Sequence, residues 1–279
     1  MKIGAHIWIG KGLGSVVETA DFLSCDCFQM FLQNPRSWKR KERENTEVMK
    51  FREGVRKHNI APVVVHMPYI MNLSSPDREI LYKSRMLFEY EMAEAEKLGA
   101  DYYVIHPGSH KGEGIKTGIK NLAESIKSFV VKKPKILVEN TAGQGNTIGG
   151  RWEDFVYLFE RFGDSIGICF DTAHAFQSGY DIRDEEKLLE MLKIIDAKLI
   201  RKGILIVHSN DSFSPLASHL DRHQHIGKGH LGIKTFEILI KNGYIGTLPF
   251  IIETPKLDIS ADEKNLDILR KIGRKYQRY

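Results

Sequence analysis

Short apolar runs alternate with longer amphipathic segments along the whole chain. Runs of four to seven apolar residues are typical of buried strands, whereas segments with one apolar face are typical of helices packed on a core. Strands are therefore predicted at residues 3–9, 27–32, 62–65, 102–105, 135–138, 166–170, 204–207 and 249–252. A first helix is predicted to start near Ser15, a candidate N-cap. Further helices are predicted at residues 46–58, 77–98, 115–131, 153–162, 184–200, 233–242 and 262–273.

The regular alternation of these elements predicts the fold. Strands that are separated by helices run parallel, and eight such units in 279 residues favour an α/β protein with a closed (β/α)8 TIM barrel. A doubly wound open sheet is the rival, but the first strand is not followed by the G-x-G-x-x-G pattern of a dinucleotide-binding turn. We therefore expect one barrel domain that spans residues 1–279.

Polar residues fall where the predicted strands end. Six consecutive strands end in a residue that can bind a metal: His66, His106, Glu139, Asp171, His208 and Glu253. The following loops add His174, Asp221 and His223. In a closed parallel barrel all these strand ends meet at the C-terminal rim, where such barrels place their active sites. Each residue alone has an ordinary explanation as a hydrogen-bonded histidine, a paired carboxylate, a helix cap or a solvated loop residue, but together they favour one metal centre.

The chemistry of these nine side chains also favours metal. Five imidazoles and four carboxylates at the rim of an apolar core would be strongly unfavourable without partners. Divalent cations keep carboxylates ionised and imidazoles neutral, so they resolve the conflict. Nine donors are too many for one ion and fit two or three ions, with a carboxylate bridging two of them. Nitrogen and oxygen ligands without thiolate suit zinc, manganese or iron.

Composition is that of an ordinary globular protein, with 42% hydrophobic and 28% charged residues and a net charge of +5. No apolar run approaches the ~20 residues of a membrane span, and no signal-peptide pattern opens the chain, so no membrane association is expected. Three cysteines without a zinc-type CxxC pair argue against a disulfide framework and predict an intracellular, cytoplasmic location. One basic loop hints at nucleic acid, with the residues Arg36, Trp38, Lys39, Arg40, Lys41 and Arg43.

Seven stretches give the sequence a family likeness. They are His66-Met-Pro-Tyr-Ile-Met-Asn-Leu, His106-Pro-Gly-Ser-His, Glu139-Asn-Thr-Ala-Gly-Gln-Gly, Cys169-Phe-Asp-Thr-Ala-His-Ala-Phe, His208-Ser-Asn-Asp-Ser, Asp221-Arg-His-Gln-His-Ile-Gly and Glu253-Thr-Pro. With these motifs, in the family's order, the chain resembles endonuclease IV, the apurinic/apyrimidinic (AP) endonuclease of base-excision repair. Several of the motifs are long and specific, so chance agreement is negligible.

The resemblance implies a DNA-repair hydrolase that cuts duplex DNA 5′ to an abasic site and leaves a 3′-hydroxyl and a 5′-deoxyribose phosphate. It also implies three Zn²⁺ ions: one on His66 and His106, a second on Asp171, His208 and Glu253, with Glu139 bridging these two, and a third on His174, Asp221 and His223. A metal-bound hydroxide between the first two ions would be the nucleophile, and the third ion would stabilise the leaving oxygen. Neither a protein nucleophile nor a nucleotide cofactor is then required.

The resemblance also implies how abasic DNA is bound. In the family, a tyrosine and an arginine on rim loops fill the gap that a flipped abasic sugar leaves in the duplex, and the matching residues here are Tyr69 and Arg36. The basic loop would bind phosphates. The chain departs from the family at Ser37, where a larger polar residue is common, and at Lys228, where an acidic residue is common. His6 and His110 are further candidates for groups that support the metal ligands.

Two other functions are compatible with parts of the sequence. A metal-dependent sugar isomerase or epimerase shares the barrel but leaves the basic loop and the group formed by His174, Asp221 and His223 without a purpose. A non-catalytic DNA-damage binder would have no need to keep all nine donors. Predicted helix faces show no long apolar stripe for dimerisation, so a monomer is expected.

Overall fold

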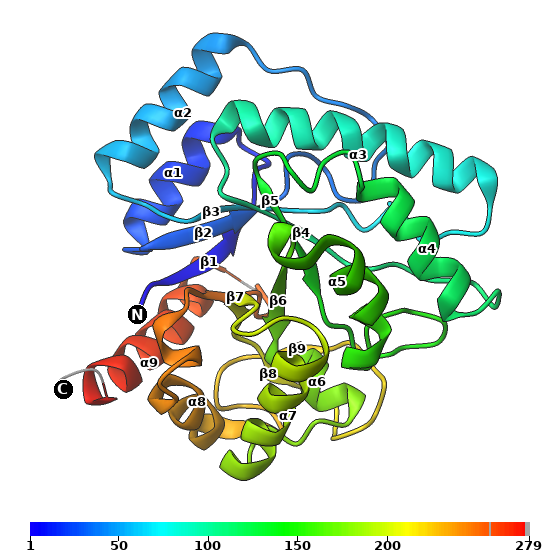
Figure 1. Ribbon diagram of the computed structural model, residues 1–279. Coiled ribbons are helices and arrows are strands. Elements are labelled where there is room, and N and C mark those ends of the chain that lie inside the picture. The colour runs from blue at the N-terminus through cyan, green and yellow to red at the C-terminus, as the bar shows by residue number, and fades with distance from the viewer. Residues whose placement is uncertain (257, 277–279) are drawn as a thin grey trace.

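Eight parallel strands close into a barrel at the centre of the molecule, in the order β1, β10, β7, β6, β5, β4, β3, β2 (Figure 1). The computed structural model describes residues 1–256 and 258–276, so residues 257 and 277–279 of the predicted domain lie outside the described part. The barrel strands are β1 (Ile3–Ile7), β2 (Cys27–Met30), β3 (Val63–His66), β4 (Tyr102–Ile105), β5 (Lys135–Glu139), β6 (Gly167–Asp171), β7 (Ile204–His208) and β10 (Phe250–Ile252). The predicted (β/α)8 barrel is confirmed, and the doubly wound open sheet is excluded.

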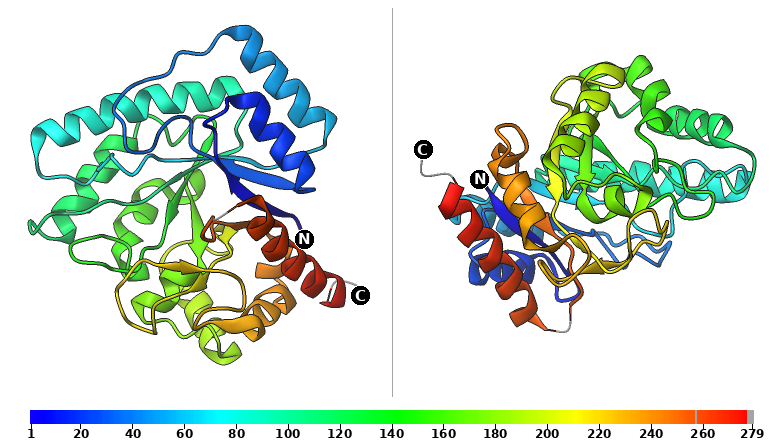
Figure 2. Two further views of the ribbon diagram at one scale, coloured as in Figure 1. Left: turned by 180° about the vertical axis from the view of Figure 1, so that it is seen from behind. Right: turned by 90° about the horizontal axis from the view of Figure 1, so that it is seen from below.

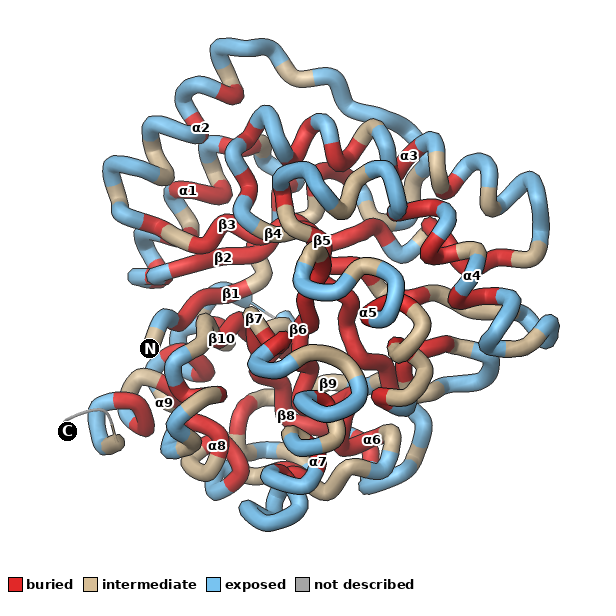
Figure 3. The backbone as a smooth tube through the Cα atoms, viewed as in Figure 1, coloured by how far each residue is buried: buried red, intermediate tan, exposed pale blue. Residues whose placement is uncertain are grey.

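Helices surround the barrel and turn their exposed faces outward (Figures 1 and 3). They are α1 (Leu13–Phe22), α2 (Asn45–Lys57), α3 (Arg78–Leu98), α4 (Ile115–Ile126), α5 (Val156–Phe162), α6 (Thr172–Ser178), α7 (Glu185–Lys198), α8 (Gly232–Lys241) and α9 (Ile259–Tyr276). The longest, α3, shows how local sequence sets the ends. The carboxylate of Asp77 accepts the backbone N–H groups of Glu79 and Ile80, and Gly99 ends the helix in the left-handed region at φ 74°.

The structure differs from the predicted elements in several places. Helix α1 begins at Leu13 behind Gly12, and Ser15 is not its N-cap, because the Ser15 hydroxyl donates to the Gly12 carbonyl from within the first turn. Helix α4 ends at Ile126 instead of residue 131, and α9 extends further than predicted in both directions. Helix α6 and a short antiparallel pair, β8 (Asp211–Ser212) with β9 (His223–Gln224), were not predicted.

Side chains of the barrel form two apolar layers. The larger one lies between the strands and the helices. Figure 3 shows that the strand segments at the centre of the molecule are buried. The smaller one fills the barrel interior with one residue from each of seven strands: Cys27, Val64, Val104, Leu137, Cys169, Ile206 and Ile251. Since side chains two positions apart share one face of a strand, the residue two positions after each of these also points into the barrel, one level closer to the C-terminal rim.

The first and last strands close the barrel. Strand β1 pairs in parallel with β10, with Ile3 opposite Phe250 and Ala5 opposite Ile252, and the N-terminus therefore lies beside α9 (Figures 1 and 2). The three cysteines are free and buried. Within residues 1–256 and 258–276, no helix combines the length and the apolar character needed to cross a bilayer.

Candidate metal centre

One layer of polar side chains lies directly above the apolar floor of the barrel. Each of its members follows a floor residue, or Gly4 of β1, by two positions: His6, Gln29, His66, His106, Glu139, Asp171, His208 and Glu253. Six of the eight are the strand-end residues predicted as ligands. The strand register therefore brings all six together at the C-terminal rim, as expected for a barrel of this kind.

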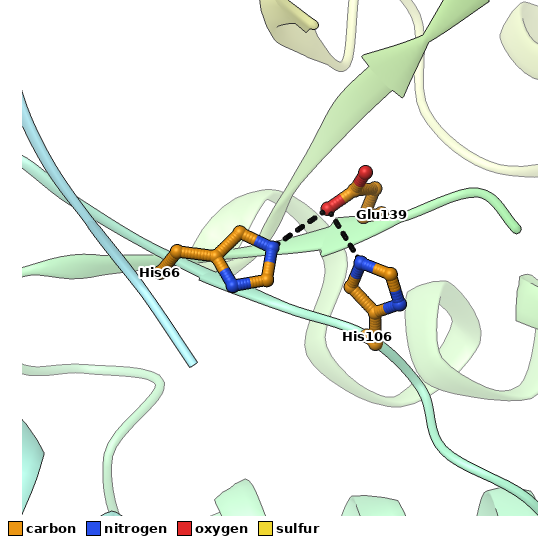
Figure 4. Close-up of side chains that lie close together, drawn as sticks. All are labelled: His66, His106 and Glu139. Atoms are coloured by element: carbon orange, nitrogen blue, oxygen red, sulfur yellow. Dashed lines mark hydrogen bonds and ion pairs between the residues drawn. The ribbon is translucent and has the colours of Figure 1, made fainter. Parts of the chain in front are cut away.

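Glu139 is at the centre of the layer and is fully buried. Its Oε2 atom lies 3.2 Å from the Nε2 atoms of both His66 and His106 (Figure 4). Its Oε1 atom lies 3.1 Å from Nδ1 of His208. Burial alone would raise the pKa of Glu139, but the imidazoles of His208 and His106 outweigh burial and hold that pKa well below its ordinary value. The carboxylate thus stays ionised and presents one oxygen to each of two histidine groups.

A second group of donors adjoins Glu139. Atoms of Asp171, His208 and Glu253 lie with it in a set whose members are all within 4.8 Å of one another. The Nδ1 atom of His208 is 3.3 Å from Oε2 of Glu253. The sulfur of Cys169 is also close, which the sequence did not suggest, but burial raises the pKa of its thiol to about 12 and so favours the neutral form.

The three loop residues form a third group at the open side of the layer. His174 Nε2 lies 3.2 Å from an oxygen of Asp221 and 3.3 Å from His223 Nε2. Asp171 is nearer to this group than predicted, since its Oδ2 atom is 3.6 Å from His223 Nε2. Asp171 therefore lies between the second and third groups, in addition to its predicted place in the second.

Hydrogen bonds to backbone carbonyls fix which nitrogen of three of these rings faces the centre. The Nδ1 atoms of His66, His174 and His223 lie 2.7, 2.9 and 3.3 Å from the carbonyl oxygens of Met67, Asn140 and Glu253. A carbonyl can only accept, so each of these Nδ1 atoms carries a hydrogen, and Nε2 is the nitrogen that faces the centre and can bind a cation. This arrangement is typical of histidines that bind metal. The donor set therefore fits divalent cations.

Local structure explains how two of these residues are placed. Asp171 is the N-cap of α6, and its Oδ1 accepts the backbone N–H of His174 at 2.7 Å. The same bond therefore orients the Asp171 carboxylate and sets His174 one turn later. Two buried asparagines complete the support: Asn140 bonds both backbone polar groups of Asp171, and the amide of Asn210 donates to its Oδ2 at 2.7 Å.

A buried carboxylate that sequence reasoning missed orders the loop after His223. Asp211 accepts five backbone N–H groups with distances of 2.7 to 3.2 Å, from Ser212, Gly227, Gly229, Leu231 and Gly232. A β-carbon at Gly229 would lie 2.2 Å from the Ser212 carbonyl oxygen and 2.5 Å from the Asp211 carboxylate, so only glycine fits there. The Gly-rich run after the Asp221-Arg-His motif is the sequence feature that could have indicated such a tightly bonded loop.

Opposite charges dominate the metal-free centre. Burial lowers the pKa of His106 and His174, but carboxylates outweigh it: Glu139 raises the pKa of His106, and Asp171 with Asp221 raises that of His174 well above 6.5. For Asp221 burial acts to raise the pKa, and the facing His174 lowers it well below the ordinary range. Protons and cations would therefore compete for these rings.

The two residues predicted to contact DNA lie on adjoining loops. The backbone N–H of Ile70 donates to the carbonyl of Pro35 at 3.1 Å, which ties the Tyr69 loop to the Arg36 loop. The Tyr69 side chain is 63% exposed, and its ring meets the edge of Phe31 with centroids 5.1 Å apart. Arg36 is exposed. Beside them, a hollow of about 350 Å³ runs from Tyr69 to His106.

The predicted basic loop is less uniform than the sequence suggested. Arg43 does not face solvent, because its side chain is 1% exposed and its guanidinium pairs with Glu94 at 3.3 Å. Arg40 stacks on the Tyr90 ring and donates to the Met86 carbonyl. Of the predicted phosphate-binding residues, Arg36, Lys39 and Lys41 remain exposed without such anchors in the described part of the chain.

The two supporting histidines proposed from the sequence have different places. His6 lies in the polar layer, with Nδ1 3.2 Å from Glu253, as expected. His110 does not support the centre: its Nδ1 accepts the backbone N–H groups of Gly112 and Gly114 in a turn. Of the two departures from the family, the Ser37 hydroxyl accepts the Lys39 backbone N–H, and Lys228 is exposed.

The closed barrel, with nitrogen and oxygen donors grouped at its C-terminal rim, places this protein in the class of TIM barrels with a candidate metal site. In agreement, residues 17–272 match the family model described as xylose isomerase-like TIM barrel. Probable endonuclease 4 of Halothermothrix orenii is 38% identical over 98% of this chain and 100% of its own length, and that of Persephonella marina is 37% identical over 98% of each. The chain belongs to the endonuclease IV family.

Solved structures agree with this assignment. Endonuclease IV from Thermus thermophilus superposes with a TM-score of 0.88 at 30% identity, over 99% of this chain and 100% of that one. A D-tagatose 3-epimerase-like protein superposes with a TM-score of 0.75 at 20% identity, over 99% of this chain and 98% of that one. The second likeness shows only that the fold is shared.

Proposed function

We propose that this protein is an AP endonuclease of DNA repair, which cleaves the phosphodiester 5′ to an abasic site in duplex DNA. The products would be a 3′-hydroxyl and a 5′-deoxyribose phosphate. The observation that carries the proposal is the meeting of nine metal-type donors at one rim, in a chain whose full-length relatives are named probable endonuclease 4. A monomeric, intracellular protein is part of the proposal, and the free, buried cysteines support the intracellular location.

Three zinc ions are the proposed cofactor, although manganese or iron would suit the same donors. The three groups of donors would each hold one ion: His66 with His106, then Asp171, His208 and Glu253, then His174, Asp221 and His223, with Glu139 bridging the first two. When bound, such ions supply a water of lowered pKa as nucleophile and a positive charge near the leaving oxygen. The outward hydrogen bonds of the histidine rings support this assignment, since they aim lone pairs inward.

The chain's own residues would select and hold the substrate. Flipping a sugar out of the stack costs least where the base is already missing, which favours abasic sites. Tyr69 and Arg36, on loops joined by a hydrogen bond, would fill the gap in the duplex. The exposed Lys39 and Lys41 would bind phosphates and make affinity fall with salt. No protein nucleophile and no nucleotide cofactor are needed.

The test is cleavage of a duplex that carries one tetrahydrofuran abasic analogue, at low salt. Zinc-replete protein is expected to cut it 5′ to the analogue, prolonged chelation to abolish cutting, and added zinc to restore it. Glu139→Gln should remove activity, whereas Glu91→Gln is the matched control. Glu91 is equally buried but lies on α3, donates no ligand atom to the centre and bonds Tyr103, and burial raises its pKa to about 8, so a neutral amide resembles its native form.

Two outcomes would replace the proposal. Turnover of a free ketose without cleavage of the duplex would favour a sugar isomerase or epimerase, and one structure that shares the fold is named as a D-tagatose 3-epimerase-like protein. Specific binding of the duplex without cleavage by the zinc-replete protein would favour a non-catalytic damage binder. Metal analysis by mass spectrometry would decide between three ions per chain and the one or two of a sugar isomerase.

A further inference from the structure

Gln29 is the one member of the polar layer that is neither an imidazole nor a carboxylate. It lies on β2, two residues after the floor residue Cys27, and it is fully buried. A buried amide is costly unless its donors and acceptor find partners. The partners of this amide are therefore informative, and all of them belong to the candidate metal centre.

The amide oxygen and nitrogen of Gln29 contact different groups. Its Oε1 lies 2.9 Å from Nε2 of His208. Its Nε2 lies 2.6 Å from Oε1 of Glu253 and 2.9 Å from Nδ1 of His6. The two hydrogens of the amide thus have two acceptors, and the oxygen has one donor. The opposite orientation of the amide would face its oxygen toward the Glu253 carboxylate, so the contacts themselves select the orientation.

This orientation determines the tautomer of His208. Because the Gln29 oxygen can only accept, Nε2 of His208 carries a hydrogen, and Nδ1, which faces Glu139 and Glu253, is the nitrogen left to bind a cation. His208 is thus the reverse of His66, His174 and His223, which use backbone carbonyls to present Nε2. At His208 the acceptor is instead a side chain from β2.

We infer that Gln29 is a positioning residue for metal binding: it fixes the His208 tautomer and orients the Glu253 carboxylate, and thereby sets the affinity of the ion that these two residues would hold. The inference rests on the proposed metal centre. Groups that orient a ligand in this way are worth about 10- to 100-fold in metal affinity. The other two ions would be affected less, because Gln29 contacts none of the donors unique to them.

The test compares Gln29→Met with Gln33→Met in zinc-binding titrations of metal-stripped protein against a competing chromophoric chelator. Methionine matches the length of glutamine but has no amide. Gln33 is a buried glutamine four residues further on, and its amide has no hydrogen-bond partner among the residues that the structure describes. Gln29→Met is expected to bind one of its ions about 10- to 100-fold more weakly than wild type, with Gln33→Met unchanged.

A second measurement needs no variant. In zinc-loaded wild type, two-bond ¹⁵N–¹H spectra are expected to show His208 protonated on Nε2, and His66, His174 and His223 protonated on Nδ1. Equal zinc affinity of folded Gln29→Met and wild type, or a proton on Nδ1 of His208, would overturn the inference alone. A wild-type chain that binds no metal would overturn the proposed function and the inference with it. If Gln29→Met fails to fold, the spectra decide.

Discussion

The substitution Asp211→Asn should destabilise the protein and loosen the loop that follows His223. Asparagine has almost the same shape as aspartate, but one carboxylate oxygen becomes an NH2 group. In the structure, Oδ1 of Asp211 accepts the backbone N–H groups of Ser212 and Leu231, and Oδ2 accepts those of Gly227, Gly229 and Gly232. Whichever way the new amide turns, at least two backbone donors face a donor.

The expected loss of stability follows from the number of hydrogen bonds that the substitution removes. A hydrogen bond to a charged group contributes about 1.5–3 kcal/mol, and two are lost, which gives about 3–6 kcal/mol before relaxation. If the NH2 group takes the Oδ2 position instead, three bonds are lost, but their donors Gly227, Gly229 and Gly232 are only partly buried, so water can replace part of them. A decrease of about 3 kcal/mol in the free energy of unfolding is therefore expected, a large fraction of the roughly 5–15 kcal/mol typical of domains.

Urea unfolding followed by circular dichroism measures this change. Asp267→Asn is the control, because that carboxylate is 59% exposed and has one pairing with Arg270 at 3.5 Å, so its loss should change stability by less than about 1 kcal/mol. Since β8 pairs with β9, which carries His223, Asp211→Asn should also bind fewer ions per chain. A stability equal to that of Asp267→Asn would refute the reasoning.

Three further predictions follow from the site. His223→Ala should reduce cleavage of abasic duplex by orders of magnitude while circular dichroism stays native, and near-normal cleavage would remove the third group of donors from the reaction. Tyr69→Ala should weaken binding of abasic duplex by about tenfold or more in fluorescence anisotropy, whereas Tyr82→Ala, an exposed tyrosine on α3, should not, and equal effects would contradict a specific role for Tyr69. In metal-free protein, facing carboxylates raise the pKa of His106 and His174 above 6.5, so the stability from their charge is complete below pH 6.5 and is lost as the pH rises through the raised values. The melting temperature of metal-free protein should therefore fall as the pH rises above about 6.5 while that of zinc-loaded protein should not, and parallel profiles would argue against the pairing.

The sequence allowed the barrel and its rim to be predicted because both depend on short-range patterns. Apolar runs mark the strands, and the residue type changes abruptly at each strand end, as at Val65 and His66 or Val207 and His208. Parallel pairing then brings all strand ends to one rim whatever the helices do. The six strand-end residues could therefore be grouped without knowledge of any distance.

Other features depend on contacts between residues far apart in the sequence, and local sequence patterns could not predict them. Gln29 resembles any strand residue until β2 and β7 show that it lies behind His208, 179 positions later. Arg43 belonged to a basic run, and only the position of Glu94 on α3 shows that it is buried. His110 belongs to a motif of the family, yet its ring accepts backbone hydrogen bonds in a local turn.

The pairing of the first and last strands has a consequence for biosynthesis. Glu253 stands immediately after β10, and β10 takes its place only by pairing with β1 and β7, whose partners include Ile3 and Val207. A nascent chain on the ribosome therefore lacks Glu253, one of the donors of the candidate metal centre, until the segment that carries β10 has emerged. Cation capture during translation would stay incomplete until that moment, which delays any cutting of DNA until the polypeptide is nearly whole.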